Sequence, residues 1–300
     1  MRVIFIIVLF FLGCSTKIDI NSFHPVNVKT SYTPSKNEIL SKTQILIVSK
    51  NPYLKNSLKE ILSNYKPIKV LNRNFKSLKD EIKLAELAKE SNSNLNQADY
   101  IIKASINSIQ KESIYHPPVY WRDKKGKLHV QRAYFTHRVC VSGELEAIKL
   151  PQNYIAFSKN LNDCQSQTSY YRYFNFSPLI ISATKNSIYS IKNNLYRFFA
   201  KRGYIFEVRE KDNKFLLHTT LGSDFGAKKG ASVDIFRIKK VKIPFTDNYK
   251  TTIVKIGSGK IVKVEPNSSW ILTDKKVLIG DFVKMNYKTS FWDIFLWDIF

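Results

Sequence analysis

The chain has 300 residues, of which 44% are hydrophobic and 13% aromatic. This composition excludes a wholly disordered chain, and the length is enough for two ordinary domains. The formal net charge of +24 has two readings: a surface that attracts polyanions, or a codon composition rich in Lys, Asn and Ile. We find no nucleic-acid-binding motif in the sequence and expect no nucleic-acid partner.

Residues 1–14 have the order of a bacterial secretory signal. A short basic start precedes an apolar run over 3–12, and the small residue Gly13 stands before Cys14. The run is shorter than the roughly 20 residues that span a bilayer as a helix. An ordinary signal peptide and an N-terminal anchor helix remain as alternatives.

The Gly13-Cys14 junction resembles a lipobox. The resemblance implies that Cys14 receives lipid and that the chain is a lipoprotein attached to a membrane through this lipid. Ser15 stands where an Asp would imply retention at the inner membrane. The same resemblance therefore implies an outer-membrane lipoprotein facing the periplasm. Residues 15–40 are polar, contain two prolines and predict a tether.

An α/β pattern follows the tether over residues 41–200. Asn51 and Pro52 predict the cap and first turn of a helix, because Asn accepts backbone N–H bonds and Pro tolerates that position. The predicted strands cover 44–48, 68–71, 98–110, 133–148 and 153–161, and the predicted helices cover 53–65, 77–89 and 179–199. This order predicts an α+β chain whose first domain is a sandwich of two or three layers.

Residues 203–288 predict a second domain made of short strands separated by Gly, Asp and Asn turns. Its phrases run Leu221-Gly222-Ser223, Lys229-Gly230-Ala231, Val233-Asp234-Ile235-Phe236, Lys260-Ile261-Val262-Lys263-Val264, Ser268-Ser269-Trp270 and Gly280-Asp281-Phe282-Val283-Lys284. They resemble the C-terminal domain of flagellar assembly protein T, which implies a small SH3-like β-barrel. We expect Gly222 and Gly230 to adopt positive φ in tight turns.

The first domain is similar to the middle domain of that family and to the curli secretion lipoproteins. The similarity is carried by residues 98–106, 139–147 and 154–159, and by the order of the elements. It implies a sandwich similar to the N-terminal domain of TolB. Strands of about ten alternating residues, which a membrane pore would need, are not evident in the sequence.

Cysteines and aromatic residues supply the candidate sites. Cys140 falls on one predicted strand and Cys164 lies just after the next, so this hairpin could bring them within bridging distance in an oxidising compartment, with two separate thiols as the alternative. The segment 115–125 combines aromatics, prolines and cations, and its Tyr115, Tyr120, Trp121 and Arg122 are of the types that dominate interfaces. The alternative is that these aromatics fold back onto the domain.

The C-terminal tail, 289–300, is a near-repeat containing Trp292 and Trp297. A tail this apolar packs on its own protein, enters a membrane interface or docks on a partner.

No catalytic or metal-binding spacing is evident among the histidines, cysteines and carboxylates, so we expect neither an enzyme nor a cofactor nor a metal site. The sequence therefore predicts a non-enzymatic envelope lipoprotein that assembles or braces a cell-envelope machine through protein partners. A homo-oligomeric ring component of the flagellar motor comes first by resemblance. A curli-type secretion accessory and a peptidoglycan- or anionic-glycan-binding module are the alternatives.

Overall fold

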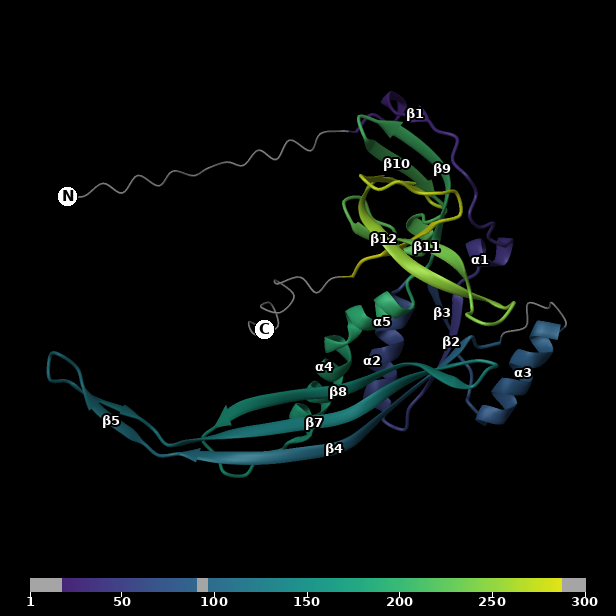
Figure 1. Cartoon of the computed structure of the whole chain (residues 1–300). Helices are drawn as coiled ribbons and strands as arrows, with labels where there is room; N and C mark the ends of the chain where they lie inside the picture. The colour runs from purple at the N-terminus through teal and green to yellow at the C-terminus, as the bar shows by residue number, and fades with distance from the viewer. Residues whose placement is uncertain (1–17, 91–96, 288–300) are drawn as a thin grey trace, which may run out of the picture.

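The computed structural model describes residues 18–90 and 97–287, and it shows a β-rich α+β fold (Figure 1). A five-stranded sheet of order β3-β2-β4-β7-β8 carries the helices, and a separate set of strands forms a barrel. The sheet strands are β2 (Thr43–Val48), β3 (Ile68–Val70), β4 (Tyr100–His116), β7 (Tyr134–Lys149) and β8 (Tyr154–Ser169). β2 is parallel to β3 and β4, whereas β7 is antiparallel to both β4 and β8.

Helices pack on both faces of this sheet. The helices of this sheet are α2 (Pro52–Ser63), α3 (Leu78–Glu90), α4 (Ser177–Ser190) and α5 (Lys192–Phe198), whereas Glu38 of the short helix α1 (Lys36–Leu40) accepts a hydrogen bond from Tyr204 of the barrel. Leu58 of α2 and Leu195 of α5 share one buried cluster with Ile45 of β2, whereas the next residue, Leu46, packs with Ala85 of α3. Adjacent residues of a strand point to opposite faces, so the continuous apolar run of β2 is buried on both sides.

The start of α2 follows the prediction from its capping residues. The Asn51 side chain accepts hydrogen bonds from the backbone N–H groups of Tyr53 and Leu54, at 2.9 and 3.2 Å. The predicted helix over 179–199, by contrast, is interrupted at Ile191, where φ is −98° and ψ is 3°. Ser187 and Ser190 lie just before the break and bond back to carbonyls three residues earlier, a pattern that bends helices.

Six strands close the C-terminal barrel in the order β9-β10-β13-β12-β11-β14, and β14 pairs back with β9. They are β9 (Gly203–Lys211), β10 (Lys214–Thr219), β11 (Ser232–Lys242), β12 (Tyr249–Val264), β13 (Ser269–Thr273) and β14 (Phe282–Met285). The barrel interior is filled by apolar side chains, among them Leu217, Val233, Ile235, Ile271 and Val283. The six strands thus enclose a packed apolar core.

The two glycines that were predicted to need positive φ differ in their backbone conformation. Gly230 has φ of +85°, as expected. Gly222 has φ of −101° and an extended ψ, so the prediction of positive φ was wrong there. A Cβ at Gly222 would lie 2.0 Å from the carbonyl oxygen of Pro266, so this position requires glycine because two backbone segments approach closely.

Residues 18–40, expected to form a tether, instead lie along the barrel. The short strand β1 (His24–Pro25) pairs with β9, and Phe23 packs with Leu216 and Trp270 on the barrel's outer face. Further along, Ser31 donates a hydrogen bond from its backbone N–H to the carbonyl of Ile279 at 2.7 Å. The expectation of a free tether is therefore wrong for these residues.

A tyrosine cluster joins the barrel to the helical layer. The rings of Tyr65 and Tyr196 stack with centroids 4.3 Å apart, and Tyr287, which follows β14, meets both rings edge-on. Tyr65 donates to the carbonyl of Tyr196, and Tyr196 donates to the carbonyl of Ile61. Burial raises the pKa of the Tyr65 hydroxyl well above its usual range. The two hydroxyl bonds hold the sheet-domain side of the cluster together, and the barrel joins it through the ring of Tyr287 and through its carbonyl, which accepts a hydrogen bond from Arg197 at 2.8 Å.

Candidate functional site

The most distinctive feature of the molecule is a β-arm that projects away from both domains (Figure 1). It consists of the outer parts of β4, β7 and β8, extended by the hairpin of β5 (Val119–Arg122) and β6 (Leu128–Gln131). We call residues 105–143 and 161–169 the arm. The arm begins at an irregularity in register between Ile106 and Ser108, opposite Gly143. A Cβ on Gly143 would lie 2.1 Å from the carbonyl oxygen of Ser105, so the strands cross very closely at this point.

Helix α4 supports one face of the arm near its base. Val139 and Val141 of β7 are buried against Leu179 and Ala183 of α4. Farther out, the fully buried ring of His137 stacks on Phe174, with centroids 4.3 Å apart. The arm is therefore anchored by packing on this face.

A disulfide lies on the opposite face of the arm. Cys140 and Cys164 stand directly across from each other on β7 and β8, with Cα atoms 4.1 Å apart, and their sulfurs are bonded. Because neighbouring residues of a strand alternate, Cys140 points away from the face that Val139 and Val141 bury. The bond ties β7 and β8 together at the same level as the packing of α4, on the other face of the arm.

The outer hairpin exposes apolar side chains on both of its faces. Register pairs Tyr120 with Val130 on one face and Trp121 with His129 on the other. Tyr120 is 64% exposed and Trp121 is 48% exposed. Val119, Leu128 and Val130 are also about half exposed. An isolated two-stranded hairpin is marginal in water, and a contiguous apolar surface of this kind marks a contact site.

The turn at the end of the hairpin is charged and well ordered. Asp123 accepts hydrogen bonds from the backbone N–H groups of Lys125 and Lys127 and is bonded to the ring of His129. The His129 bond lowers the pKa of the Asp123 carboxyl, and the two backbone bonds act in the same direction. Arg122 donates to the carbonyl of Gly126 at 2.9 Å, so its guanidinium braces the turn. The end of the arm is thus polar, and the apolar residues lie behind it.

The structure brings four of the expected partner-binding residues onto the arm. Tyr115 is the last residue but one of β4 and lies against Phe135, with ring centroids 5.1 Å apart. Tyr120, Trp121 and Arg122 follow on β5. Because Tyr120 and Trp121 are adjacent on one strand, they do not converge on a single surface. Cys14, Trp292 and Trp297, the other expected residues, lie outside the described residues.

Sequence reasoning missed several exposed apolar residues on or beside the arm. They are Ile109, Ile114, Leu128, Val130, Tyr170, Tyr171 and Tyr173. The alternation of apolar and polar residues over 128–131 is a strand signal that points to the hairpin partner of β5.

Both outer edges of the arm are open over the described residues. β4 pairs with β2 only over Tyr100–Lys103, so its remaining thirteen residues, 104–116, have a neighbour on the β7 side alone. β8 pairs only with β7 over its whole length of 16 residues. Long open edges present unpaired N–H and C=O groups to any other strand.

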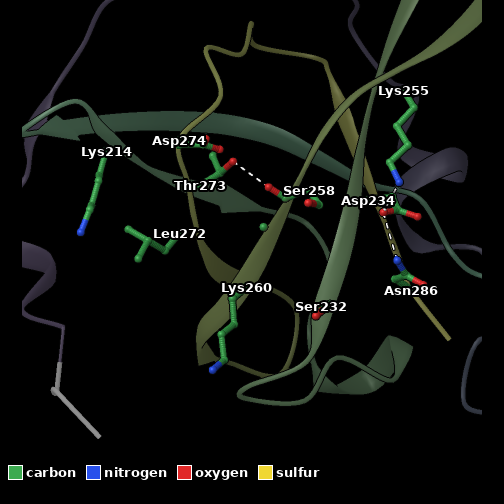
Figure 2. Close-up of a pocket in the computed structure, with 11 residues that line it drawn as sticks. Lys214, Ser232, Asp234, Lys255, Ser258, Lys260, Leu272, Thr273, Asp274 and Asn286 are labelled. Carbon is green, nitrogen blue, oxygen red and sulfur yellow. Dashed lines mark hydrogen bonds and ion pairs between the residues drawn. The ribbon is translucent and has the colours of Figure 1, made fainter. Parts of the chain in front are cut away.

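The barrel wall carries a groove of about 410 Å³, shown in Figure 2. Asp234 at its side is neutralised by Lys255, at 2.7 Å, and also accepts a hydrogen bond from the Asn286 amide. Lys214 and Lys260 also line the groove, and Figure 2 shows no interaction between them and the other residues drawn. The groove therefore offers cations and hydroxyl groups to a ligand.

One chain of polar contacts on the barrel has the residue types of a catalytic triad. His218 lies 3.1 Å from Glu207 and 3.2 Å from the Ser268 hydroxyl. Ser268, however, donates its single proton to Glu265 at 2.7 Å and not to the His218 ring. A general base must instead accept the serine proton. Stacking of His218 on Trp270 at 4.0 Å further fixes the ring, and this geometry favours a structural role.

Two further features of the described part of the chain bear on metal binding and on membrane crossing. Within residues 18–90 and 97–287, no three His, Cys, Asp or Glu side chains gather closely enough to hold a metal ion. The helices in these residues are all too short or too polar to cross a membrane.

Comparisons with known proteins find no match in sequence and several matches among solved structures. No family model matches the chain, and no curated protein matches its sequence. Among solved structures, a minor lipoprotein from Acinetobacter baumannii has 13% identity and a TM-score of 0.26, with 51% of this chain and 91% of that chain covered. A putative neuraminyllactose-binding hemagglutinin homolog from Helicobacter pylori has 12% identity and a TM-score of 0.30, with 57% and 91% covered.

A PelC dodecamer from Paraburkholderia phytofirmans is a further match, at 13% identity and a TM-score of 0.20, with 54% of this chain and 96% of that chain covered. Scores this low carry no functional argument. The resemblance to flagellar assembly protein T and to curli secretion lipoproteins stays a prediction.

Proposed function

We propose that this protein is a non-enzymatic lipoprotein of the cell envelope, anchored through Cys14, that uses its arm to assemble with other protein subunits. The first such subunit is a second copy of the chain, so the assembly would be a homo-oligomeric ring. The observation that carries the proposal is the arm itself, with two open edges and an apolar hairpin exposed on both faces. A surface of this kind is stabilised when it is covered.

A protein partner suits the arm better than a membrane does. The hairpin ends in Arg122, Lys124, Lys125 and Lys127, with a single carboxylate, Asp123. Inserting the hairpin into hydrocarbon would bury these charges before any apolar residue, at a cost of about 2.5–3.5 kcal/mol for each cation at the bilayer centre. Lateral packing against protein covers Tyr120 and Trp121 while the charged turn stays in water.

The machine is proposed from the sequence resemblance. A ring that braces the flagellar motor comes first and a curli-type secretion accessory second, both at the periplasmic face of the outer membrane. The finer fold assignments belong to the same proposal: a first domain similar to the N-terminal domain of TolB and an SH3-like barrel.

Site-specific photocrosslinking in cells tests the proposal. A photoreactive amino acid at Tyr120 in the full chain should give products at multiples of the chain mass. The same residue at Tyr154, which is 54% exposed and begins β8 at the end away from the arm, should give far less product. Mass spectrometry of further adducts would then name the machine. A chain that crosslinks to nothing at Tyr120, or equally at both positions, would contradict assembly through the arm.

The barrel groove supports a second candidate function, binding of peptidoglycan or another anionic glycan. Lys214 and Lys260 line the groove beside the hydroxyls of Ser258 and Thr273. Such groups recognise carboxylates and sugar hydroxyls together. Sedimentation with purified cell wall should then fall when both lysines become Gln. Unchanged sedimentation would remove this candidate.

A further inference from the structure

A second hairpin projects from the barrel, where β11 and β12 extend beyond it. We call residues 239–250 the barrel tip. Phe245 is fully exposed (107%), and Val241, Ile243 and Tyr249 are exposed by 50%, 40% and 64%. The tip is closed by two hydrogen bonds, from the backbone N–H of Ile243 to the carbonyl of Asn248 and from that of Thr246 to the carbonyl of Ile243. The apolar side chains are therefore held on an ordered hairpin.

Charges lie behind the apolar end of the barrel tip. Lys239, Lys240 and Lys242 are on β11, and Lys250 is on β12. Asp247 is the single carboxylate of the segment, so four lysines and one aspartate give a net charge of +3. Lys242 pairs with Asp247 at 3.2 Å, whereas the other three lysines have no carboxylate in ion-pairing range among the described residues.

Phe245 also adopts a backbone conformation that bulky side chains avoid. Its φ is +63°, in the left-handed region. Nothing packs on the ring, so the fold gains no burial from the residue in exchange for this strain. Strained residues of this kind cluster at functional sites. The turn presents Phe245 outward, away from the barrel.

We propose that the barrel tip enters the interface of an anionic lipid bilayer. Ile243 and Phe245 would lie among the upper acyl chains, Tyr249 would lie at the headgroups, where amphipathic rings are favoured, and the lysines would contact lipid phosphates. The order of residues is the reverse of that on the arm. On the barrel tip Phe245 lies in the turn, and Lys239, Lys240 and Lys250 lie behind it on the strands. Asp247 also lies in the turn, where it is paired with Lys242, so the tip brings an ion pair and no unpaired cation to the acyl chains.

This contact does not depend on the lipid at Cys14. One acyl chain alone gives marginal, reversible membrane binding, and a cationic surface adds a second signal. Each lysine near an anionic surface strengthens binding about fivefold. Replacing Lys239, Lys240 and Lys250 by Gln should therefore weaken binding about a hundredfold, and added salt should have a similar effect.

An environment-sensitive fluorophore at the tip tests the proposal. The full chain with Cys14→Ser and Phe245→Cys has one free thiol, because Cys140 and Cys164 are bonded to each other. Labelled with a nitrobenzoxadiazole dye, it is mixed with vesicles of phosphatidylcholine alone or of phosphatidylcholine with phosphatidylglycerol. A matched chain carries the label at Tyr154, on the sheet domain. Free glycerol phosphate serves as the control for a soluble anion.

The expected result is a brighter, blue-shifted emission from the label at position 245 with the anionic vesicles. The emission should not change with phosphatidylcholine vesicles, with glycerol phosphate, or when the label is at position 154. Lys239→Gln/Lys240→Gln/Lys250→Gln should abolish the change at the same lipid concentration. If the chain sediments with vesicles while the label at 245 stays unchanged, the membrane contact lies elsewhere and the proposal fails. It fails equally if purified peptidoglycan changes the emission and the vesicles do not.

Discussion

Truncating Trp121 is the sharpest test of the arm, because its exposed area sets the expected loss. A tryptophan side chain presents about 200 Å², so an exposed fraction of 48% leaves about 100 Å² for a partner to cover. At about 25 cal/mol per Å², this burial is worth about 2.5 kcal/mol. Trp121→Ala should therefore weaken self-association of the chain between 50- and 100-fold.

Sedimentation equilibrium over a concentration series measures this effect. The Cys14→Ser chain serves as the reference, since it lacks the proposed lipid anchor, and Tyr154→Ala serves as the matched control. The melting temperature should change little, because in the isolated chain Trp121 mainly contacts His129, at 5.4 Å between ring centroids. A reference chain that stays monomeric at high concentration, or a Trp121→Ala chain that associates normally, would refute the reasoning.

Tyr120→Ala extends the same test to the other face of the hairpin. Tyr120 and Trp121 point to opposite sides, so a partner that covers one face affects one variant only. Losses in both variants would mean that the hairpin inserts between two surfaces. The pair of measurements therefore reports the geometry of assembly as well as its strength.

Three further predictions concern stability. Replacing Cys140 and Cys164 by Ser should lower the free energy of unfolding by about 3 kcal/mol in denaturant titrations, and reductant should have no further effect on that variant. Gly280→Ala should cost more than about 1 kcal/mol and expose residues 18–40 to proteolysis, because φ is +88° and a Cβ would lie 1.9 Å from the carbonyl oxygen of Tyr32. Burial lowers the pKa of Lys284 to about 8, so the unfolded chain binds more protons between about pH 8 and 10, and stability should rise with pH in that window. Lys284→Met should flatten the rise and add up to about 3 kcal/mol at pH 7 in thermal unfolding; an unchanged slope would contradict the burial argument.

Local signals predicted the parts of the fold that local physics controls. Asn51 and Pro52 predicted the start of α2, because a cap acts on the next few residues alone. The alternating short segments after residue 203 predicted a small barrel, which the six closed strands confirm at that level. The positive φ of Gly230 was predicted for the same reason, because a tight turn constrains the backbone of its own residues.

Contacts between distant residues were beyond such reasoning. His24 pairs with Glu210, 186 positions later, and the polar segment 18–40 contains no local pattern that predicts this pairing. Gly222 looked like a turn glycine, but the close approach of Pro266 is the actual constraint. Strands over 98–110 and 133–148 were predicted, but the continuation of β4 to His116, of β8 to Ser169 and the hairpin of β5 and β6 were not, because strand periodicity says which faces alternate and not how far the strands continue past the core.

The two projecting hairpins explain why residue order decides more than composition. Both combine exposed apolar side chains, several lysines and a single carboxylate, so composition alone assigns them the same role. On the arm the charged turn at 122–127 lies outermost, and hydrocarbon would have to accept ions first. On the barrel tip Phe245 lies in the turn beside the Lys242–Asp247 ion pair, and the unpaired lysines follow on the strands, so they meet lipid phosphates while the apolar end enters the bilayer. Exchanging the turn 123–127 for an apolar one should therefore shift the arm toward membrane binding, whereas Phe245→Lys should abolish vesicle binding by the barrel tip.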